Sequence, residues 1–176
     1  MPLASTDVGF FLSGGGANSD PNASLGGVIS STQITSGALN NLFDDVSSAE
    51  ALAGDVEYRC IYVQNIYSGS PEIVAENISL FVQTLSPSTD TSFAIGVAAE
   101  GANVTAETIA NESSAPVGNS PNVEFFESSA SPHALALGNL SPGEWIGVWI
   151  RRTVSAAASA YTNDGPTLRA TFDTAG

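Results

Sequence analysis

The sequence predicts an all-β protein, an antiparallel β-sandwich of the immunoglobulin-like or jelly-roll-like kind with one short helix. Short runs of β-branched and aromatic residues recur along the chain, separated by turns rich in Gly, Pro, Ser and Asn, which is the pattern of strands joined as hairpins. The clearest runs alternate with a period of two. No helical pattern of crossover length lies between them, so an antiparallel arrangement is favoured.

The first 46 residues are expected to form an N-terminal strand and an extended glycine-rich arm or loop packed on the domain, which is a β-sandwich formed by residues 47–176. Residues 7–12 (DVGFFL) form a short apolar strand candidate. Residues 13–31 contain five glycines and hardly any large side chains, so this segment buries little surface to offset the entropy of ordering it. We expect either a mobile loop or an arm that becomes ordered against a neighbouring subunit.

The single helix is expected just before the longest strand. Ser47 and Glu50 have the spacing of a capping box, and Gly54 follows as the residue that ends the helix. Residues 54–65 (GDVEYRCIYVQN) are largely apolar on both parities, which predicts a central strand covered on both faces by a second sheet or a partner chain. Glu57 and Arg59 share one parity, and we expect them where the sheet meets solvent or another subunit, because lone charges avoid a dry core.

The remaining strands follow at hairpin-like spacing. They are expected at residues 77–85, 93–97, 105–109, 123–126, 135–137, 144–154 and 167–173. The run 144–154 (EWIGVWIRRTV) places Trp145, Trp149 and Arg151 on one parity. In the last strand, apolar residues at 168, 170 and 172 point inward, and Arg169 and Thr171 point outward.

The charge balance excludes several classes of partner. The chain has 18 acidic residues, four arginines and no lysine, with a net charge of −14 at pH 7. Such a surface repels nucleic acid and disfavours an anionic membrane. The acidic excess is expected to serve solubility, and a basic protein partner is the alternative. No apolar run approaches the ~20 residues of a membrane helix, and the N-terminal sequence lacks the features of a secretory signal, so a cytosolic protein is expected.

The sequence offers no convincing catalytic or metal site, and we expect neither enzymatic activity nor a cofactor. It has one histidine, His133, and one cysteine, Cys60, which is too few for a zinc site. Cys60 is expected to be a buried small hydrophobe. The acidic pairs Asp44-Asp45 and Glu124/Glu127 are interpreted as solvated acids, because neither pair has a fixed structural context and nothing in the chain matches the EF-hand calcium spacing.

Arginine and tryptophan residues supply the candidate interface. Trp145 and Trp149 are interpreted as core first, as a protein interface second and as a sugar-stacking platform third, which keeps a carbohydrate-binding module as an alternative function. The arginines sit on strands in a chain otherwise poor in cations, and we expect at least one to cross a subunit interface by pairing with a carboxylate. Intramolecular surface pairs are the alternative. The candidate interface residues are Arg59, Arg151, Arg152, Arg169 and Trp149.

Three segments, in order, resemble a family of small virion structural proteins of tailed bacteriophages with a β-sandwich fold. They are residues 39–65, with the motif YRCIYVQN, residues 140–161, with the motif WIRRTV, and residues 163–173 (NDGPTLRATFD). Together they cover about a third of the chain. The family's usual Pro-Ala-Gly after the late strand is replaced here by Ser155-Ala156-Ala157, so this turn is expected to differ.

The resemblance implies a virion protein assembled in the host cytoplasm. Within the particle, the expected role is a head decoration (cement) protein that binds neighbouring capsid subunits, with a neck, tail or fibre-adaptor position as the alternative. The expected partners are the major capsid protein or other virion proteins and further copies of the chain itself, a trimer being favoured.

Overall fold

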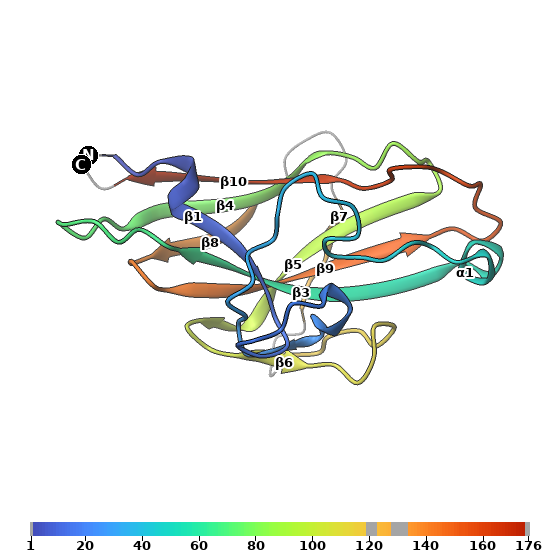
Figure 1. Ribbon diagram of the computed structural model, residues 1–176, viewed down its shortest axis with the longest axis horizontal. Helices are drawn as coiled ribbons and strands as arrows, with labels where there is room; N and C mark the ends of the chain where they lie inside the picture. The colour runs from blue at the N-terminus through green and yellow to red at the C-terminus, as the bar shows by residue number, and fades with distance from the viewer. Residues whose placement is uncertain (1, 119–122, 128–133, 175–176) are drawn as a thin grey trace.

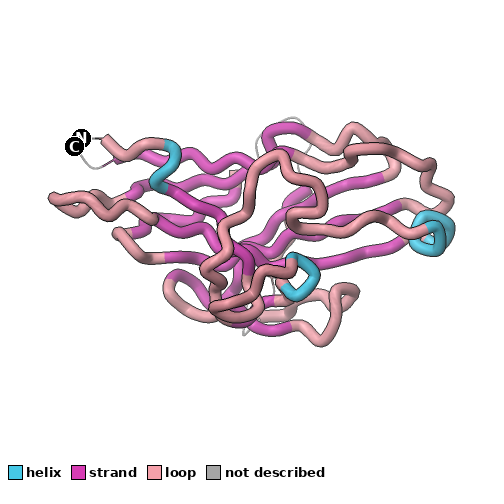
Figure 2. Tube along the Cα trace, viewed as in Figure 1, coloured by secondary structure: helices cyan, strands magenta, loops and turns pink. Residues whose placement is uncertain are grey.

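The computed structural model describes residues 2–118, 123–127 and 134–174. The chain is mostly β, with antiparallel sheets and one short α-helix, as the sequence predicts (Figures 1 and 2). The strands are β1 (Val8–Leu12), β2 (Gly26–Gly27), β3 (Asp55–Asn65), β4 (Ala75–Thr84), β5 (Thr91–Ala102), β6 (Ala106–Thr108), β7 (Phe126–Glu127), β8 (Leu135–Leu140), β9 (Trp145–Val154) and β10 (Thr167–Thr174). The helices are α1 (Ser48–Ala53) and the 3-10 turns η1 (Ser5–Asp7) and η2 (Pro21–Ala23).

The strands form two main sheets and a short ribbon. The five-stranded sheet has the order β1-β3-β9-β5-β7, the three-stranded sheet the order β10-β4-β8, and the ribbon consists of β2 and β6. All neighbours are antiparallel. The two segments that carry the strongest strand patterns, β3 and β9, pair along their whole length from Asp55↔Val154 to Gln64↔Trp145.

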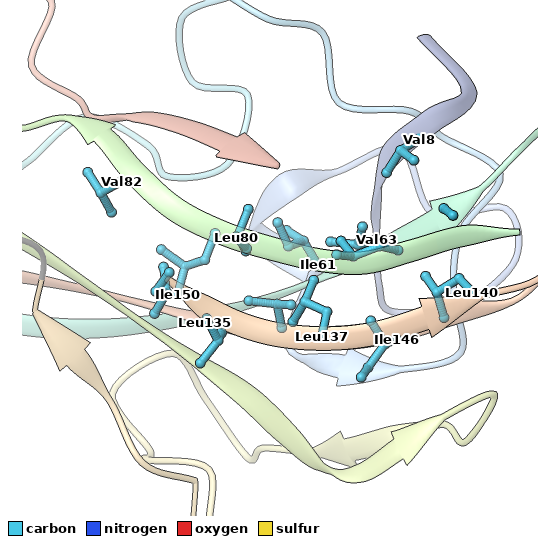
Figure 3. Packing of buried hydrophobic residues seen from close by; sticks show 14 of the residues in the cluster. Val8, Ile61, Val63, Leu80, Val82, Leu135, Leu137, Leu140, Ile146 and Ile150 are labelled. Atoms are coloured by element: carbon cyan, nitrogen blue, oxygen red, sulfur yellow. The ribbon is translucent and has the colours of Figure 1, made fainter. Parts of the chain in front are cut away.

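The main core lies between the five-stranded and the three-stranded sheet. One face of β3 and β9 contributes Ile61, Val63, Val148 and Ile150, which pack against residues of β4 and β8 (Figure 3). This burial follows from the period-two alternation, since every second residue of each strand faces the opposing sheet. The β4 and β8 members of the core are Ala75, Ile78, Leu80, Val82, Leu135, Leu137 and Leu140.

A second, smaller core covers the other face of the five-stranded sheet. Tyr58, Cys60, Tyr62 and Trp149 lie on this face and are at most 9% exposed. They are covered by Leu25 and Ile29 of the glycine-rich segment, by the β2–β6 ribbon and by Val123 and Phe125. The prediction that β3 is covered on both faces is therefore confirmed, and both covers come from the chain itself.

The helix α1 forms as its local sequence predicts. The Ser47 hydroxyl accepts a hydrogen bond from the Glu50 amide, and the Glu50 carboxylate accepts one from the Ser47 amide, which completes the capping box. Gly54 ends the helix with a φ of 79°, a value that a residue with a side chain rarely adopts. The helix then leads directly into β3.

The glycine-rich segment packs on the sandwich of its own chain. Ser13 and Ser24 are fully buried. The Ser13 hydroxyl donates to the Cys60 carbonyl at 2.8 Å and accepts from the Gly26 amide at 3.1 Å. Gly26 has a φ of +90°, and a Cβ at this position would overlap the Glu107 carbonyl oxygen of β6. The glycines thus permit close backbone packing instead of mobility.

The same segment also closes an edge of the five-stranded sheet. β1 pairs only with the second half of β3, from Leu12↔Ile61 to Val8↔Asn65. Beyond that point the Cys60 amide donates to the Ser24 carbonyl at 2.8 Å, and the Tyr58 amide donates to the Glu112 carbonyl at 2.7 Å. These bonds satisfy backbone donors of β3 that would otherwise be buried without a partner.

Candidate functional site

A cluster of buried charges lies at the end of the main core, next to the paired strands β3 and β9. Glu57 stands directly opposite Arg152 in the β3–β9 register, so the two side chains leave the sheet on the same face. The Arg152 Nε donates to Glu57 Oε2 at 2.5 Å, and Arg152 Nη2 forms an ion pair with the same oxygen. Arg152 Nη1 also donates to the Asp44 carbonyl oxygen at 2.6 Å. The cluster therefore fastens the loop before α1 to the sheet.

Arg59 belongs to the same cluster and reaches around the edge of β3. Its Nη2 lies 3.9 Å from Glu57 Oε1, 2.6 Å from Glu112 Oε2 and 3.1 Å from Asn22 Oδ1. Its Nη1 donates to the Tyr58 carbonyl at 3.2 Å. The guanidinium thus connects β3 to two loops that are far away in the sequence.

An aromatic ring lies against both guanidinium groups. The Cζ of Arg152 lies 4.8 Å and the Cζ of Arg59 5.3 Å from the centroid of the Phe43 ring. The edge of this ring contacts Phe93 of β5, with a centroid distance of 5.8 Å. Cation–π contacts of this kind add stability when the cation is desolvated.

The protonation of Glu57 is set by burial and by these guanidinium groups. Burial raises the pKa of Glu57, whereas the charges of Arg152 and, more weakly, Arg59 oppose the rise. Because Glu57 is only 2% exposed, its carboxylate depends on both arginines for compensation of the lost hydration. The cluster is thus a structural element of the fold, and removal of either arginine would leave the buried carboxylate poorly compensated.

These positions correct three interface predictions. Arg59 and Trp149 have no exposed surface, and Arg152 is only 6% exposed, so none of them is available to a partner of the folded chain. Glu57 and Arg59 do not mark a boundary with solvent or with another subunit, because both are buried. The prediction failed because the pattern within one strand does not reveal the distant groups that compensate a buried charge. Here those groups are Arg152 and Glu112.

The other two arginines remain at or near the surface. Arg151 is half-buried, and its Cζ lies 5.2 Å from the centroid of the Phe125 ring. Arg169, on β10, is exposed. All four arginines lie in the described part of the chain, and Arg169 is the only exposed one among them. The outer surface is therefore even more acidic than the net charge indicates.

Trp149 lies in the core, as the first of its three interpretations predicts. Trp149 is fully buried in the second core, so a platform of two exposed tryptophans for a sugar ring is wrong. Trp145 is half-buried and packs edge-on against Tyr62, with ring centroids 5.0 Å apart. The Tyr62 hydroxyl donates to the Gly27 carbonyl at 2.6 Å and accepts from the Ala106 amide at 2.9 Å, which ties the β2–β6 ribbon to the sheet. Burial raises the pKa of this hydroxyl.

Among the residues that sequence reasoning considered for chemistry, Cys60 is a buried hydrophobe as predicted. It is fully buried, and burial raises the pKa of its thiol. His133 lies outside the described residues. Asp44 is not a purely solvated acid, because its carboxylate lies 3.5 Å from Arg152 Nη2. Sequence reasoning found no sign of Glu112, whose carboxylate lies 2.6 Å from Arg59 Nη2, since no local pattern distinguishes it from a turn residue.

The part of the chain that the structure describes holds no group of three or more His, Cys, Asp or Glu residues that could bind a metal ion. No helix within it is long and apolar enough to cross a membrane. A shallow depression lies between the glycine-rich segment and residues 32–41, and its lining contains no charged residue, histidine or cysteine.

No family model matches the chain, and neither a characterised protein nor a solved structure is significantly similar to it.

Proposed function

We propose that this protein is a structural component of a tailed-bacteriophage virion, and that within the particle it is a head decoration protein that stabilises the shell by binding neighbouring capsid subunits. The proposal begins with the resemblance of residues 39–65, 140–161 and 163–173 to small virion proteins of the β-sandwich type. A sandwich whose known features are structural suits such a role better than a role in catalysis.

The observation that carries the proposal is the position of the resembling segments in the fold. The first contains Phe43, α1 and β3, the second contains β9, and the third contains most of β10. The first two meet in the buried cluster, where Arg152 of one segment contacts Glu57 and Asp44 of the other. The segments on which the resemblance rests therefore include residues that make the contacts holding the framework together, which supports the proposal of a common fold.

The charge of the surface supports the same setting. Two of the four arginines are buried in the ion-pair cluster, while acidic residues such as Asp45, Glu72 and Glu124 are exposed. An acidic exterior keeps a protein soluble at high local concentration. It also keeps the protein away from packaged DNA, because phosphate binding requires clustered cations.

The test is to delete the gene from the phage that encodes it and to compare the particles with wild-type virions. A decoration protein should be dispensable for shell assembly, and particles lacking it should lose infectivity faster on heating or osmotic shock. Resupplying the wild-type protein to purified particles should restore resistance. Resupplying the Arg152→Met variant, which weakens the framework, should restore less at elevated temperature.

Two results would count against the decoration role. Particles lacking the protein with unchanged resistance would refute shell stabilisation. Particles that fail to assemble tails or to join heads to tails would instead support the neck, tail or fibre-adaptor position.

A further inference from the structure

Strand β10 is an open edge of the three-stranded sheet. It is the terminal strand in the order β10-β4-β8 and runs along the upper border of the molecule in Figure 1. All eight of its residues are at least partly exposed. Among the described residues, no backbone hydrogen bond joins its outer side to another segment. Such a row of unpaired donors and acceptors is a template for a further strand.

The strand is also regular, although its pairing with β4 is not. Thr171↔Ser79 is followed by Asp173↔Glu76, and Thr167↔Thr84 is followed by Leu168↔Val82. In both places the extra residue lies in β4, so β10 itself carries no bulge. Edge strands that are protected from pairing usually contain bulges, prolines or charged side chains, including charges that point inward. β10 has no bulge and no proline, and its two charged residues, Arg169 and Asp173, lie on the exposed face.

Other sheet edges are less suited to accept a strand. β1 is covered by residues 30–34, whose backbone bonds to it include Ile34 N to Phe10 O and Leu12 N to Thr32 O. β8 is shorter and contains Gly138 at a φ of +81°, which interrupts its extended backbone.

The sequence of β10, TLRATFDT, is complementary to itself in the antiparallel direction. If Thr171 faces Thr171 of a second copy, Arg169 of each copy faces Asp173 of the other, and Ala170 faces Phe172. Two oppositely charged pairs then flank the axis on the exposed face. On the inner face, the small side chain of Ala170 faces the large side chain of Phe172 of the other copy.

The inner face of such a pair would continue the main core. Leu168, Ala170 and Phe172 are only partly buried and pack against the edge of that core. A second copy of β10 would cover their exposed parts and join the two three-stranded sheets into one sheet of six strands. Burial of this apolar surface supplies a driving force for association.

We propose that two copies of this chain associate through antiparallel pairing of their β10 strands about a twofold axis at Thr171. A second copy is the occupant that the local charges of β10 favour, because this register sets Arg169, the only exposed arginine of each chain, against Asp173 of the other copy. The interface is isologous, because both copies use the same surface and every contact between the two copies occurs twice, once in each direction. The proposal does not depend on a place in a virion.

The first test uses two single substitutions and their mixture, with sedimentation velocity as the measurement. Arg169→Asp leaves acidic residues at both paired positions, and Asp173→Arg leaves basic residues at both. Each variant alone should therefore dimerise more weakly than the wild type, by about ten- to a hundredfold in Kd, because two attractive cross-strand pairs become repulsive. An equimolar mixture should form heterodimers, since opposite charges then face each other at both positions.

Glu72→Arg is the matched control. Glu72 is exposed and lies outside β10, and this substitution changes the net charge by the same amount as Asp173→Arg. It should leave dimerisation no weaker than in the wild type. Thermal melting of each variant confirms that it is folded before its association is measured.

The second test determines the register. Thr171→Cys should form an intermolecular disulfide on mild oxidation, because side chains directly opposite each other have Cβ atoms ~4.5–5.5 Å apart. Thr167→Cys should not, since the two copies of residue 167 would lie ~26 Å apart at ~3.3 Å per residue. The native Cys60 is fully buried and gives no background.

A wild-type chain that stays monomeric at high concentration would overturn the proposal. So would a dimer that both charge variants leave intact, or equal cross-linking at positions 171 and 167. The trimer that the resemblance implies has no twofold axis, so a wild-type trimer that shows no cross-link through Thr171→Cys would also overturn it. Failure of this pairing would leave the proposed virion role untouched. Conversely, a protein that forms the dimer but does not protect the shell would refute the decoration role alone.

Discussion

Replacing Arg152 with methionine tests the buried charge cluster most sharply. The substitution removes the guanidinium that donates to Glu57 Oε2 and to the Asp44 carbonyl, while the methionine side chain still fills most of the space. Glu57, which is 2% exposed, then keeps only Arg59 at 3.9 Å as a compensating charge. Breaking one partner of a buried ion pair costs about 3–5 kcal/mol.

That loss is large relative to the stability of a typical domain, which is about 5–15 kcal/mol. We therefore expect a folded variant whose free energy of unfolding is lower by about 3–5 kcal/mol at pH 8. Urea denaturation followed by tryptophan fluorescence measures it, because Trp149 is fully buried in the native state. The slope of the free energy against urea should stay unchanged, since the surface exposed on unfolding is nearly the same.

The loss should also depend on pH, with a definite sign. Burial raises the pKa of Glu57 and Arg152 is the strongest group opposing that rise, so its removal raises the pKa of Glu57 further. A carboxyl group whose pKa is raised on folding stabilises fully below its unfolded pKa, and this contribution is lost as the pH rises through the folded value. The destabilisation should therefore be smaller at pH 5 than at pH 8. Adding Glu57→Gln should remove this pH dependence.

Arg151→Met is the matched control, because it is the same substitution at the next residue of β9. Arg151 points to the opposite face and stacks on Phe125, a contact worth about 0.5–1 kcal/mol at a partly exposed site. If Arg152→Met costs no more than Arg151→Met, or if its cost does not change with pH, the cluster does not stabilise the fold in the way described.

Three further predictions concern the loops and the helix. Gly26→Ala should lower stability by about 1–3 kcal/mol, because it forces a side chain into a left-handed backbone conformation, and thermal unfolding measures the loss. Tyr62→Phe should cost about 1–3 kcal/mol, because it leaves the buried partners of the hydroxyl unsatisfied, and hydrogen exchange should become faster in the β2–β6 ribbon. The pKa of Glu50 is lowered, first by the hydrogen bond from the Ser47 amide, so its stabilising contribution is present above the unfolded pKa and is lost as the pH falls through the folded value. An NMR titration should give a midpoint below the ordinary value for Glu50, and Ser47→Ala should move that midpoint upward.

Each of these has an outcome that contradicts it. An unchanged melting temperature for Gly26→Ala, compared with Gly16→Ala at a glycine that has open space around it, would show that the close packing of Gly26 is unimportant. Unchanged exchange in Tyr62→Phe would show that the ribbon is held by other contacts. A Glu50 midpoint at its ordinary value would show that the capping box is not formed in solution.

The sequence predicts the elements of this fold well where the signal is local. Ser47 and Glu50 define the start of α1 because both halves of a capping box lie within one turn. The alternation in β3 predicts two covered faces because a strand exposes every second residue to the same side. Trp149 is correctly ranked as core for the same reason.

The sequence predicts long-range contacts poorly, and two cases show why. Glu57 and Arg59 look like surface residues until Arg152, on another strand, and Glu112, on a distant loop, supply the charges that permit their burial. The glycine-rich segment looks mobile by composition, yet Gly26 is required for close contact with β6. In both cases the deciding partner lies far along the chain, where periodicity carries no information.

We propose that this protein works as an assembled part of a virion shell. Quantitative mass spectrometry of purified, intact particles tests it most directly by measuring the amount of this chain relative to the major capsid protein. The protein should remain with the particles through purification, at an abundance comparable to that of the shell subunits. A chain that is absent from washed particles and stays in the soluble lysate would contradict it.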